Sequence, residues 1–245
     1  MKIKYDLHIH SCLSPCAENE MTPNSIAGMA MLGGIRVAAL TDHNSVKNCP
    51  AFYEACRKYG VVPIAGMEIT TAEEIHVVCL FPTLEAAMEF GELVDAGRMK
   101  IKNRADIFGQ QLIMDAQDEV IGEEEHLLLS ASDMDIFTVA DEVFSLGGVA
   151  YPAHIEKPTD SIIAMLGDIP KEAGFSSAEI KEMDRVDDLI EKYPILKEMT
   201  IVSNSDSHTL EGLVGEPQEL DIEVVSDDEN EIRNAVIATL RGRSR

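Results

Sequence analysis

The chain has 245 residues, 45% of them hydrophobic, and carries a formal net charge of -24 at pH 7. This length can bury one sizeable core, and the lack of a long apolar run or a signal sequence predicts a cytoplasmic protein without a transmembrane helix. Because a strongly acidic surface repels the phosphate backbone and anionic lipids, we expect neither duplex nucleic acid nor a membrane among its partners.

Strand-like apolar runs alternate with helical patterns along most of the chain. In chain order the predicted elements are strand 2–9, helix 24–35, strand 36–43, helix 49–60, strand 61–70, strand 74–81, helix 83–94, helix 135–148, strand 149–156, helix 161–169, strand 177–181, helix 186–193, strand 199–208, strand 219–225 and helix 230–242. Alternating units of this kind predict parallel strands joined by right-handed crossovers, and about seven repeats favour a closed barrel over an open sheet.

Residues 96–131 interrupt this alternation and are the one candidate insertion in a single domain of residues 1–245. We expect a helical excursion, with two interpretations open. Its charges can form a solvated surface, or the segment can be a cap beside the active site. In the second case its basic residues help to hold an anion: Arg98, Lys100, Lys102 and Arg104.

Histidines and carboxylates gather at the ends of the predicted strands. His8 and His10 alternate along the first strand, so their imidazoles lie on one face. The others at or beside strand ends are His43, Glu68, His76, His154, Asp206 and His208. Functional groups of parallel α/β folds collect at the carboxyl ends of the strands, so we expect all of these side chains at one rim.

This set of side chains indicates a metal centre. Imidazoles and carboxylates are ligands of borderline and hard divalent ions, and the set is too large for one tetrahedral ion, which favours two or three ions. His126 follows three glutamates and is interpreted instead as a solvated residue.

Five short motifs carry most of these residues: DLHIHS from Asp6, TDHNS from Thr41, GMEIT from Gly66, PAH from Pro152 and SDSH from Ser205. In this order they resemble the motifs of the PHP (polymerase and histidinol phosphatase) superfamily over nearly the whole chain. The resemblance implies a distorted seven-stranded (β/α) barrel with two or three metal ions at the strand ends. The chain is most similar to the free-standing metal-dependent phosphoesterases of small substrates.

Carried over residue by residue, the resemblance implies three metal sites. They lie at His8, His10, Glu68 and Asp206; at Glu68, His76 and His154; and at His43 and His208. The third site usually gains a ligand from the loop after the first strand, for which Glu18 is the candidate and Glu20 and Cys16 are alternatives. Asp6 and Asp42 are expected to orient imidazoles. The metals implied are Zn, Mn or Fe, because imidazole and carboxylate ligands suit all three.

The resemblance further implies hydrolysis of a phosphoester by a metal-activated water, with Glu68, Asp206 and His208 as the catalytic residues. The expected partner is a small phosphorylated substrate, a phosphomonoester or the phosphoester of a nucleotide or short oligonucleotide. Its phosphate oxygens need cationic donors. Lys157, three residues after His154, is the best candidate, although an ordinary surface lysine is an equal interpretation, and Arg185 comes next.

Two other classes of function stay open at this point. The amidohydrolases also open with a His-x-His pair on the first strand of a barrel and bind two metals, although the late Asp-x-His and early Thr-Asp-His of this chain fit phosphoesterases better. A non-catalytic metal-binding module is the second alternative, and the nearly complete ligand set argues against it.

Overall fold

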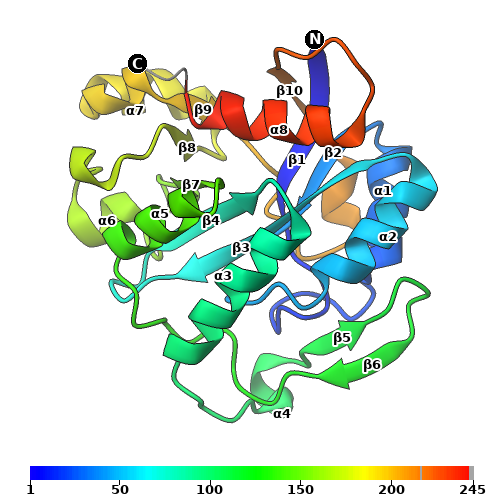
Figure 1. Cartoon of the computed structure of the whole chain (residues 1–245). Coiled ribbons are helices and arrows are strands. Elements are labelled where there is room, and N and C mark those ends of the chain that lie inside the picture. Colours follow the sequence, from blue (N-terminus) through cyan, green and yellow to red (C-terminus); the bar gives the residue numbers. More distant parts are fainter. Residues whose placement is uncertain (216, 243–245) are drawn as a thin grey trace.

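The computed structural model describes residues 1–215 and 217–242 and shows a mixed α/β fold around a curled sheet (Figure 1). The main sheet has six strands in the order β10-β1-β2-β3-β4-β7, and β5-β6 and β8-β9 form separate pairs. The strands are β1 Lys2–Ile9, β2 Val37–Leu40, β3 Val62–Thr70, β4 His76–Phe81, β5 Leu112–Met114, β6 Val120–Glu123, β7 Val149–Pro152, β8 Ser177–Glu179, β9 Thr200–Val202 and β10 Gln218–Asp221.

The helices begin at the caps that their sequences provide. Thr22 caps the first helix by accepting a hydrogen bond from the Ser25 backbone N–H, and Pro23 follows at the first helical position. The α-helices are α1 Pro23–Leu32, α2 Cys49–Tyr59, α3 Leu84–Gly97, α4 Ala105–Phe108, α5 Ile136–Ser145, α6 Ile162–Leu166, α7 Val186–Lys192 and α8 Glu229–Leu240. Short 3-10 turns lie at Lys171–Ala173, Met183–Arg185, Pro194–Glu198 and Glu211–Val214. Within the described ranges, no helix combines the length and the apolar character needed to cross a membrane.

Two hydrophobic cores lie on the two faces of the sheet. Along β2, Ala38 and Leu40 face the outer core, which α1, α2, α3 and α5 cover, whereas Val37 and Ala39 face the inner core. Helix α8 closes the inner core at the end of the sheet where β1 begins (Figure 1). The opposite end, where β1, β2 and β3 finish, is therefore free to carry polar side chains.

The sheet departs from the expected arrangement of parallel strands. β1, β2 and β3 are parallel, but β4 runs antiparallel to both β3 and β7, and β10 runs antiparallel to β1. Only residues 71–75 join β3 to β4, and so short a link permits an antiparallel pair but no crossover helix. The seven-stranded barrel stays a prediction. Beyond the sheet pairings, the Ile155 N–H after β7 donates to the Glu179 carbonyl of β8 at 3.0 Å, and the Ile9–Ser207 bridge joins β1 to the loop after β9.

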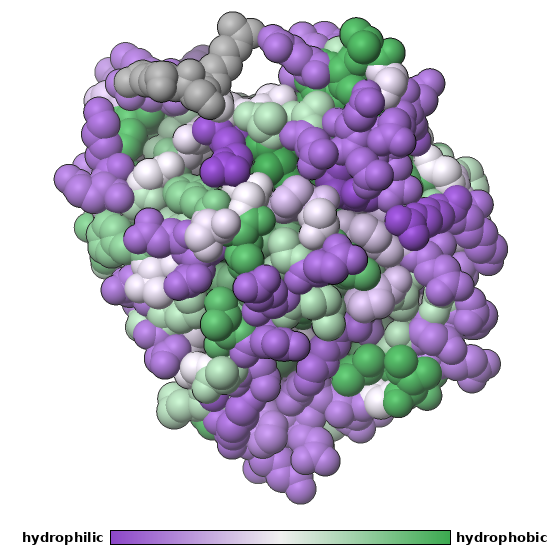
Figure 2. Space-filling model, viewed as in Figure 1, coloured by the Kyte–Doolittle hydropathy of each residue, from purple (hydrophilic) through white to green (hydrophobic). Residues whose placement is uncertain are grey.

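The insertion is a hairpin and not the expected helical segment. Beyond the four-residue helix α4, it contains the antiparallel strands β5 and β6. The Asp115 side chain holds the turn between them by accepting hydrogen bonds from the backbone N–H groups of Gln117 and Glu119, both at 2.9 Å. Sequence periodicity misses strands of three and four residues. The hairpin exposes a hydrophobic patch that includes Val120 and Ile121 (Figure 2).

Two buried asparagines attach the insertion to the end of the sheet where β1 and β2 finish. Asn48 donates to the Leu112 carbonyl at 3.1 Å and accepts from the Met114 N–H at 2.9 Å. Asn44 donates to the Leu128 carbonyl at 2.7 Å and accepts from the N–H of Thr70 at 3.0 Å. These contacts support the interpretation of residues 96–131 as a cap that is attached beside the strand ends and belongs to the same domain. This interpretation stays a proposal.

This attachment predicts an unequal effect of two asparagine substitutions. Asn48→Ala leaves the buried Met114 N–H without its acceptor and removes one donor from the Leu112 carbonyl, so the free energy of unfolding should fall by about 2 to 3 kcal/mol. Asn19→Ala removes only the exposed hydrogen bond to Gln110 and should change the free energy of unfolding by less than about 0.5 kcal/mol. Urea unfolding of both variants measures the difference. Equal losses, or release of a stable folded fragment 96–131 by limited proteolysis, would contradict the attachment.

Candidate metal centre

The predicted ligands come together where β1, β2 and β3 end. His8 and His10 come from the end of β1, and His43 lies in the loop after β2. Because β4 is antiparallel to β3, its first residue, His76, pairs with Thr70 at the end of β3 and reaches the same rim. Loops after β7 and β9 deliver the remaining ligands, His154, Asp206 and His208.

Glu68 is the centre of this cluster and is only 1% exposed. Five imidazoles surround its carboxylate: His8, His10, His43, His76 and His154. Oε1 lies 3.0 to 3.2 Å from nitrogen atoms of three of them. Oε2 lies 3.1 and 3.3 Å from nitrogen atoms of the other two. One carboxylate therefore contacts imidazoles from four other segments of the chain.

Asp206 and His208 complete the cluster on its more open side. Asp206 Oδ1 lies 3.5 Å from the Nε2 atoms of both His8 and His10, and the His208 ring stacks on that of His10 with centroids 4.2 Å apart. Asp206 and His154 have φ values of 49° and 31°. Left-handed backbone at non-glycine residues is uncommon and tends to occur at functional sites.

The electrostatics of the cluster depend on mutual compensation. Burial acts to raise the pKa of Glu68, but the imidazoles of His76, His8 and His43 hold it well below its usual range. Burial, together with the neighbouring His10, holds the pKa of His43 well below its usual range, and the same two causes lower that of His208 to about 4. A neutral imidazole keeps a lone pair for a metal ion.

The donor set fits divalent metal ions. Three groups have ligand atoms within 4.8 Å of one another: His8, His10 and Glu68; His43, Glu68 and His76; and His10, His43 and His208. Several buried atoms in the cluster lack a hydrogen-bond partner: His43 Nδ1, Glu68 Oε1, His76 Nδ1 and His154 Nδ1. Orphaned buried polar atoms are costly, and coordination would satisfy them. The grouping differs from the expected one because His43 joins Glu68 and His76 as well as His208.

Glu179 is a functional residue that the sequence analysis missed. Its buried carboxylate lies 3.0 Å from His8 Nδ1 and also accepts hydrogen bonds from the His154 N–H and from Asn204 Nδ2. With its Nδ1 held by Glu179, the imidazole of His8 directs Nε2 toward Glu68, an arrangement typical of metal-binding histidines. The available signal was an acidic residue inside the short apolar run at 177–181.

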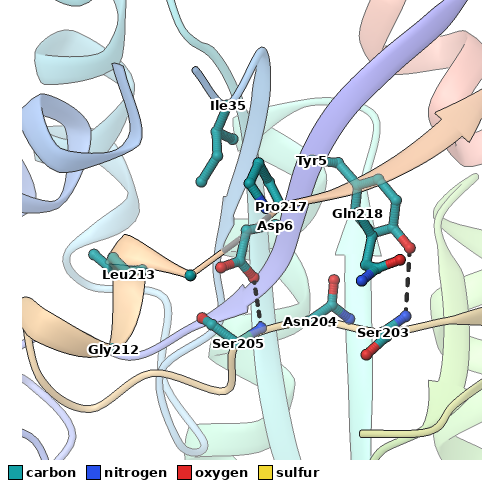
Figure 3. A pocket seen from close by; sticks show the side chains of 11 residues that line it. Tyr5, Asp6, Ile35, Ser203, Asn204, Ser205, Gly212, Leu213, Pro217 and Gln218 are labelled. Carbon is teal, nitrogen blue, oxygen red and sulfur yellow. Dashed lines mark hydrogen bonds between the residues drawn. The ribbon is translucent and has the colours of Figure 1, made fainter. Parts of the chain in front are cut away.

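Asp42 and Asp6 act less directly than expected. Ser14 Oγ links Asp42 to the cluster, donating to its Oδ1 at 2.7 Å and lying 3.0 Å from His10 Nδ1. Asp6 contacts backbone and not an imidazole. Its Oδ1 accepts a hydrogen bond from the Ser205 N–H, which Figure 3 shows, and another from the His8 N–H. Burial raises the pKa of Asp6 to about 6. Asp42 thus holds Ser14 beside His10, and Asp6 holds the backbone beside His8.

The structure does not bring Glu18 or Arg185 into the cluster. Glu18 is exposed, and among the described residues its carboxylate belongs to none of the three candidate groups, nor do Glu20 or Cys16. Only its backbone N–H comes near, donating to the His208 carbonyl at 3.0 Å. Arg185 pairs with Glu182 at 3.0 Å on the surface. The expectation for Glu18 rests on its place in the loop before the first helix, and that loop leaves its side chain exposed.

Three of the basic residues at the start of the insertion are engaged in local ion pairs. Arg98 and Lys100 both pair with Asp95, and Arg104 pairs with Asp106. Lys157, in contrast, reaches the cluster, with its Nζ 2.8 Å from Asp206 Oδ2. The sequence analysis missed a second lysine, Lys181, whose Nζ lies 3.2 Å from the same oxygen.

Comparisons with known proteins agree with this architecture. The PHP domain family model matches residues 6–193. A segment of 83 residues is 35% identical to a 5'-3' exoribonuclease of Haemophilus influenzae and covers 33% of this chain and 29% of that protein. Among solved structures, the lesion-specific endonuclease PfuEndoQ of Pyrococcus furiosus superimposes with a TM-score of 0.72 at 21% identity. The match covers all of this chain and 57% of the endonuclease. A protein of Bifidobacterium adolescentis described as a metal-dependent phosphoesterase superimposes with a TM-score of 0.59 at 18% identity. The match covers 98% of this chain and 96% of that protein.

The fold and the cluster define a mixed α/β protein whose histidine and carboxylate groups can bind metal ions at the strand ends. The chain belongs to the PHP domain family. The three proteins just compared are described as an exoribonuclease, an endonuclease and a metal-dependent phosphoesterase. The chain corresponds to part of the exoribonuclease and of the endonuclease.

The expectation that excluded duplex nucleic acid is wrong. Endonuclease Q has been solved with a 27-mer duplex substrate that carries an abasic lesion at the active site. It shares this fold with a TM-score of 0.63 at 20% identity, and the match covers 100% of this chain and 57% of that one. Net charge describes the whole surface, whereas a substrate meets the local potential of the site. Here two lysines lie at the edge of the cluster.

Proposed function

We propose that this chain hydrolyses a phosphoester bond, with a phosphomonoester, a nucleotide or a short oligonucleotide as substrate, and that it needs two or three divalent metal ions to do so. The observation that carries the proposal is the Glu68 carboxylate, buried and within 3.0 to 3.3 Å of five imidazole nitrogens. Such an arrangement of a central carboxylate and imidazole nitrogen atoms suits adjacent cations. The exoribonuclease among the relatives favours nucleotides and oligonucleotides.

When bound, paired metal ions lower the pKa of a water from about 16 to about 7 and stabilise the charge of the transition state. The protein supplies the geometry for this chemistry. Glu68 bridges the ligands of different strands, and Asp206 directs one oxygen at His8 and His10. Glu179 and Ser14 hold the Nδ1 atoms of His8 and His10, so both imidazoles present Nε2 to the centre of the cluster. Lys157, whose Nζ lies 2.8 Å from Asp206 Oδ2, is the proposed contact of the phosphate oxygens.

A substrate panel tests this function against the two alternatives. Purified protein loaded with manganese, zinc or iron is incubated with phosphomonoesters, nucleotides, short single strands, a duplex with an abasic site, and amide and lactone substrates. We expect cleavage of at least one phosphoester and its loss on chelation. Turnover of amides or lactones alone would favour an amidohydrolase-like activity. Failure to cleave any substrate with every metal would favour a non-catalytic metal-binding module.

A further inference from the structure

The cluster is accessible along one edge. The side chains of His8, His10 and His154 are at most 2% exposed, and that of His43 is 6% exposed. The insertion holds the loop after His43 through the buried Asn44. The partly exposed side chains are those of His76, His208, Lys157 and Lys181. The two lysines therefore lie where solvent, and a substrate, can reach the cluster.

The lysines reach one oxygen atom from two different loops. Lys157 comes from the loop after β7 and Lys181 from the loop after β8, and their Nζ atoms lie 2.8 and 3.2 Å from Asp206 Oδ2. The other oxygen of Asp206 faces His8 and His10. Asp206 thus joins the imidazole cluster to a pair of ammonium groups at its open edge.

Glu156 fixes the spacing of the two loops. Its Oε1 accepts hydrogen bonds from the backbone N–H groups of Lys181 and Glu182, at 2.6 and 2.8 Å. The Lys157 N–H closes a turn onto the His154 carbonyl at 2.9 Å. Both lysine backbones are therefore held in place. Each ammonium group carries three N–H donors, of which Asp206 accepts one, so donors remain for an anion that arrives at the open edge.

We propose that Lys157 and Lys181 form a two-lysine clamp that binds the non-bridging oxygens of the substrate's phosphoryl group beside Asp206. This inference rests on the proposed phosphoester hydrolysis and adds Lys181 as a substrate-binding residue. Lysine is a suitable phosphate ligand because its ammonium is a compact point charge. The competing interpretation is that the two lysines only neutralise Asp206 and never contact substrate.

Binding of inorganic phosphate to the metal-loaded protein tests the clamp. Lys181→Met and Lys157→Met should each weaken phosphate binding by about 10- to 100-fold, the range for losing one charged hydrogen bond, and the double variant more than either. Lys181→Arg should recover most of the affinity. The matched control is Lys2→Met, which removes an exposed lysine at the far end of β1 and should leave binding unchanged. Calorimetry gives the affinity, and elemental analysis gives the metal content of each variant.

The outcomes separate the clamp from the function on which it rests. Unchanged phosphate affinity in Lys181→Met and in the double variant overturns the clamp, even if wild type hydrolyses phosphoesters. Affinity that falls only in proportion to lost metal also overturns it, because the lysines then act through Asp206. Weakened binding at full metal content supports the clamp. If that result comes with a wild type that cleaves no phosphoester, the clamp stands and the hydrolase assignment fails.

Discussion

Replacing Glu68 with glutamine is expected to remove at least one bound metal ion and to lower phosphoester hydrolysis by about three orders of magnitude or more. Glu68→Gln keeps the shape of the side chain but removes a negative charge from the centre of five imidazoles. Without that charge two cations are no longer held close together, and the activation of water by paired metals, among the larger catalytic effects, is lost.

The measurement is product release and metal content per chain, with His126→Ala as the control. His126 lies in the insertion with its Nδ1 3.5 Å from Glu124, and it belongs to none of the candidate metal groups. Its replacement should leave both quantities nearly unchanged. Turnover like that of wild type in the glutamine variant would show that Glu68 does not bridge metal ions.

Replacing Glu179 with glutamine is expected to weaken metal binding by about 10- to 100-fold, the range typical of residues that orient metal ligands. The carboxylate of Glu179 contacts Nδ1 of His8, and its charge raises the pKa of His8 although burial lowers it. An amide in its place holds His8 less firmly, and the imidazole becomes a weaker ligand of a metal ion. Glu172→Gln, an exposed glutamate in the 3-10 turn Lys171–Ala173, serves as the control.

Titration of the metal-free protein with manganese or zinc measures this effect. We expect a higher dissociation constant for Glu179→Gln at an unchanged fold, monitored by circular dichroism, and the wild-type constant for Glu172→Gln. An unchanged constant for Glu179→Gln would mean that the contact with His8 is structural only.

The strand-end ligands were predictable because their positions follow from a simple rule. Alternation along β1 places His8 and His10 on one face, and residues that follow parallel strands share a rim. The structure brings His43 and Glu68 together there as well. The rule rests on local patterns, so it holds wherever a ligand lies directly at the end of a strand.

Residues whose position depends on chain reversal or long-range contact were not predictable in the same way. His76 was expected at the rim, but it lies there because β4 is antiparallel, which a single apolar run does not indicate. Glu179 and Lys181 come from a three-residue strand and the loop after it, and their roles depend on contacts with His8 and Asp206, far away in sequence. The hairpin in the insertion was missed for a related reason, because strands of three and four residues give no clear period.

The central claim is that the imidazole and carboxylate cluster around Glu68 is a metal centre that hydrolyses phosphoesters. Elemental analysis of the protein before and after chelation, combined with phosphoester hydrolysis by the same samples, tests it most directly. We predict two or three divalent ions per chain, loss of hydrolysis together with the ions, and recovery of both when manganese, zinc or iron is restored. Full hydrolysis by protein that holds far less than one ion per chain would contradict the claim.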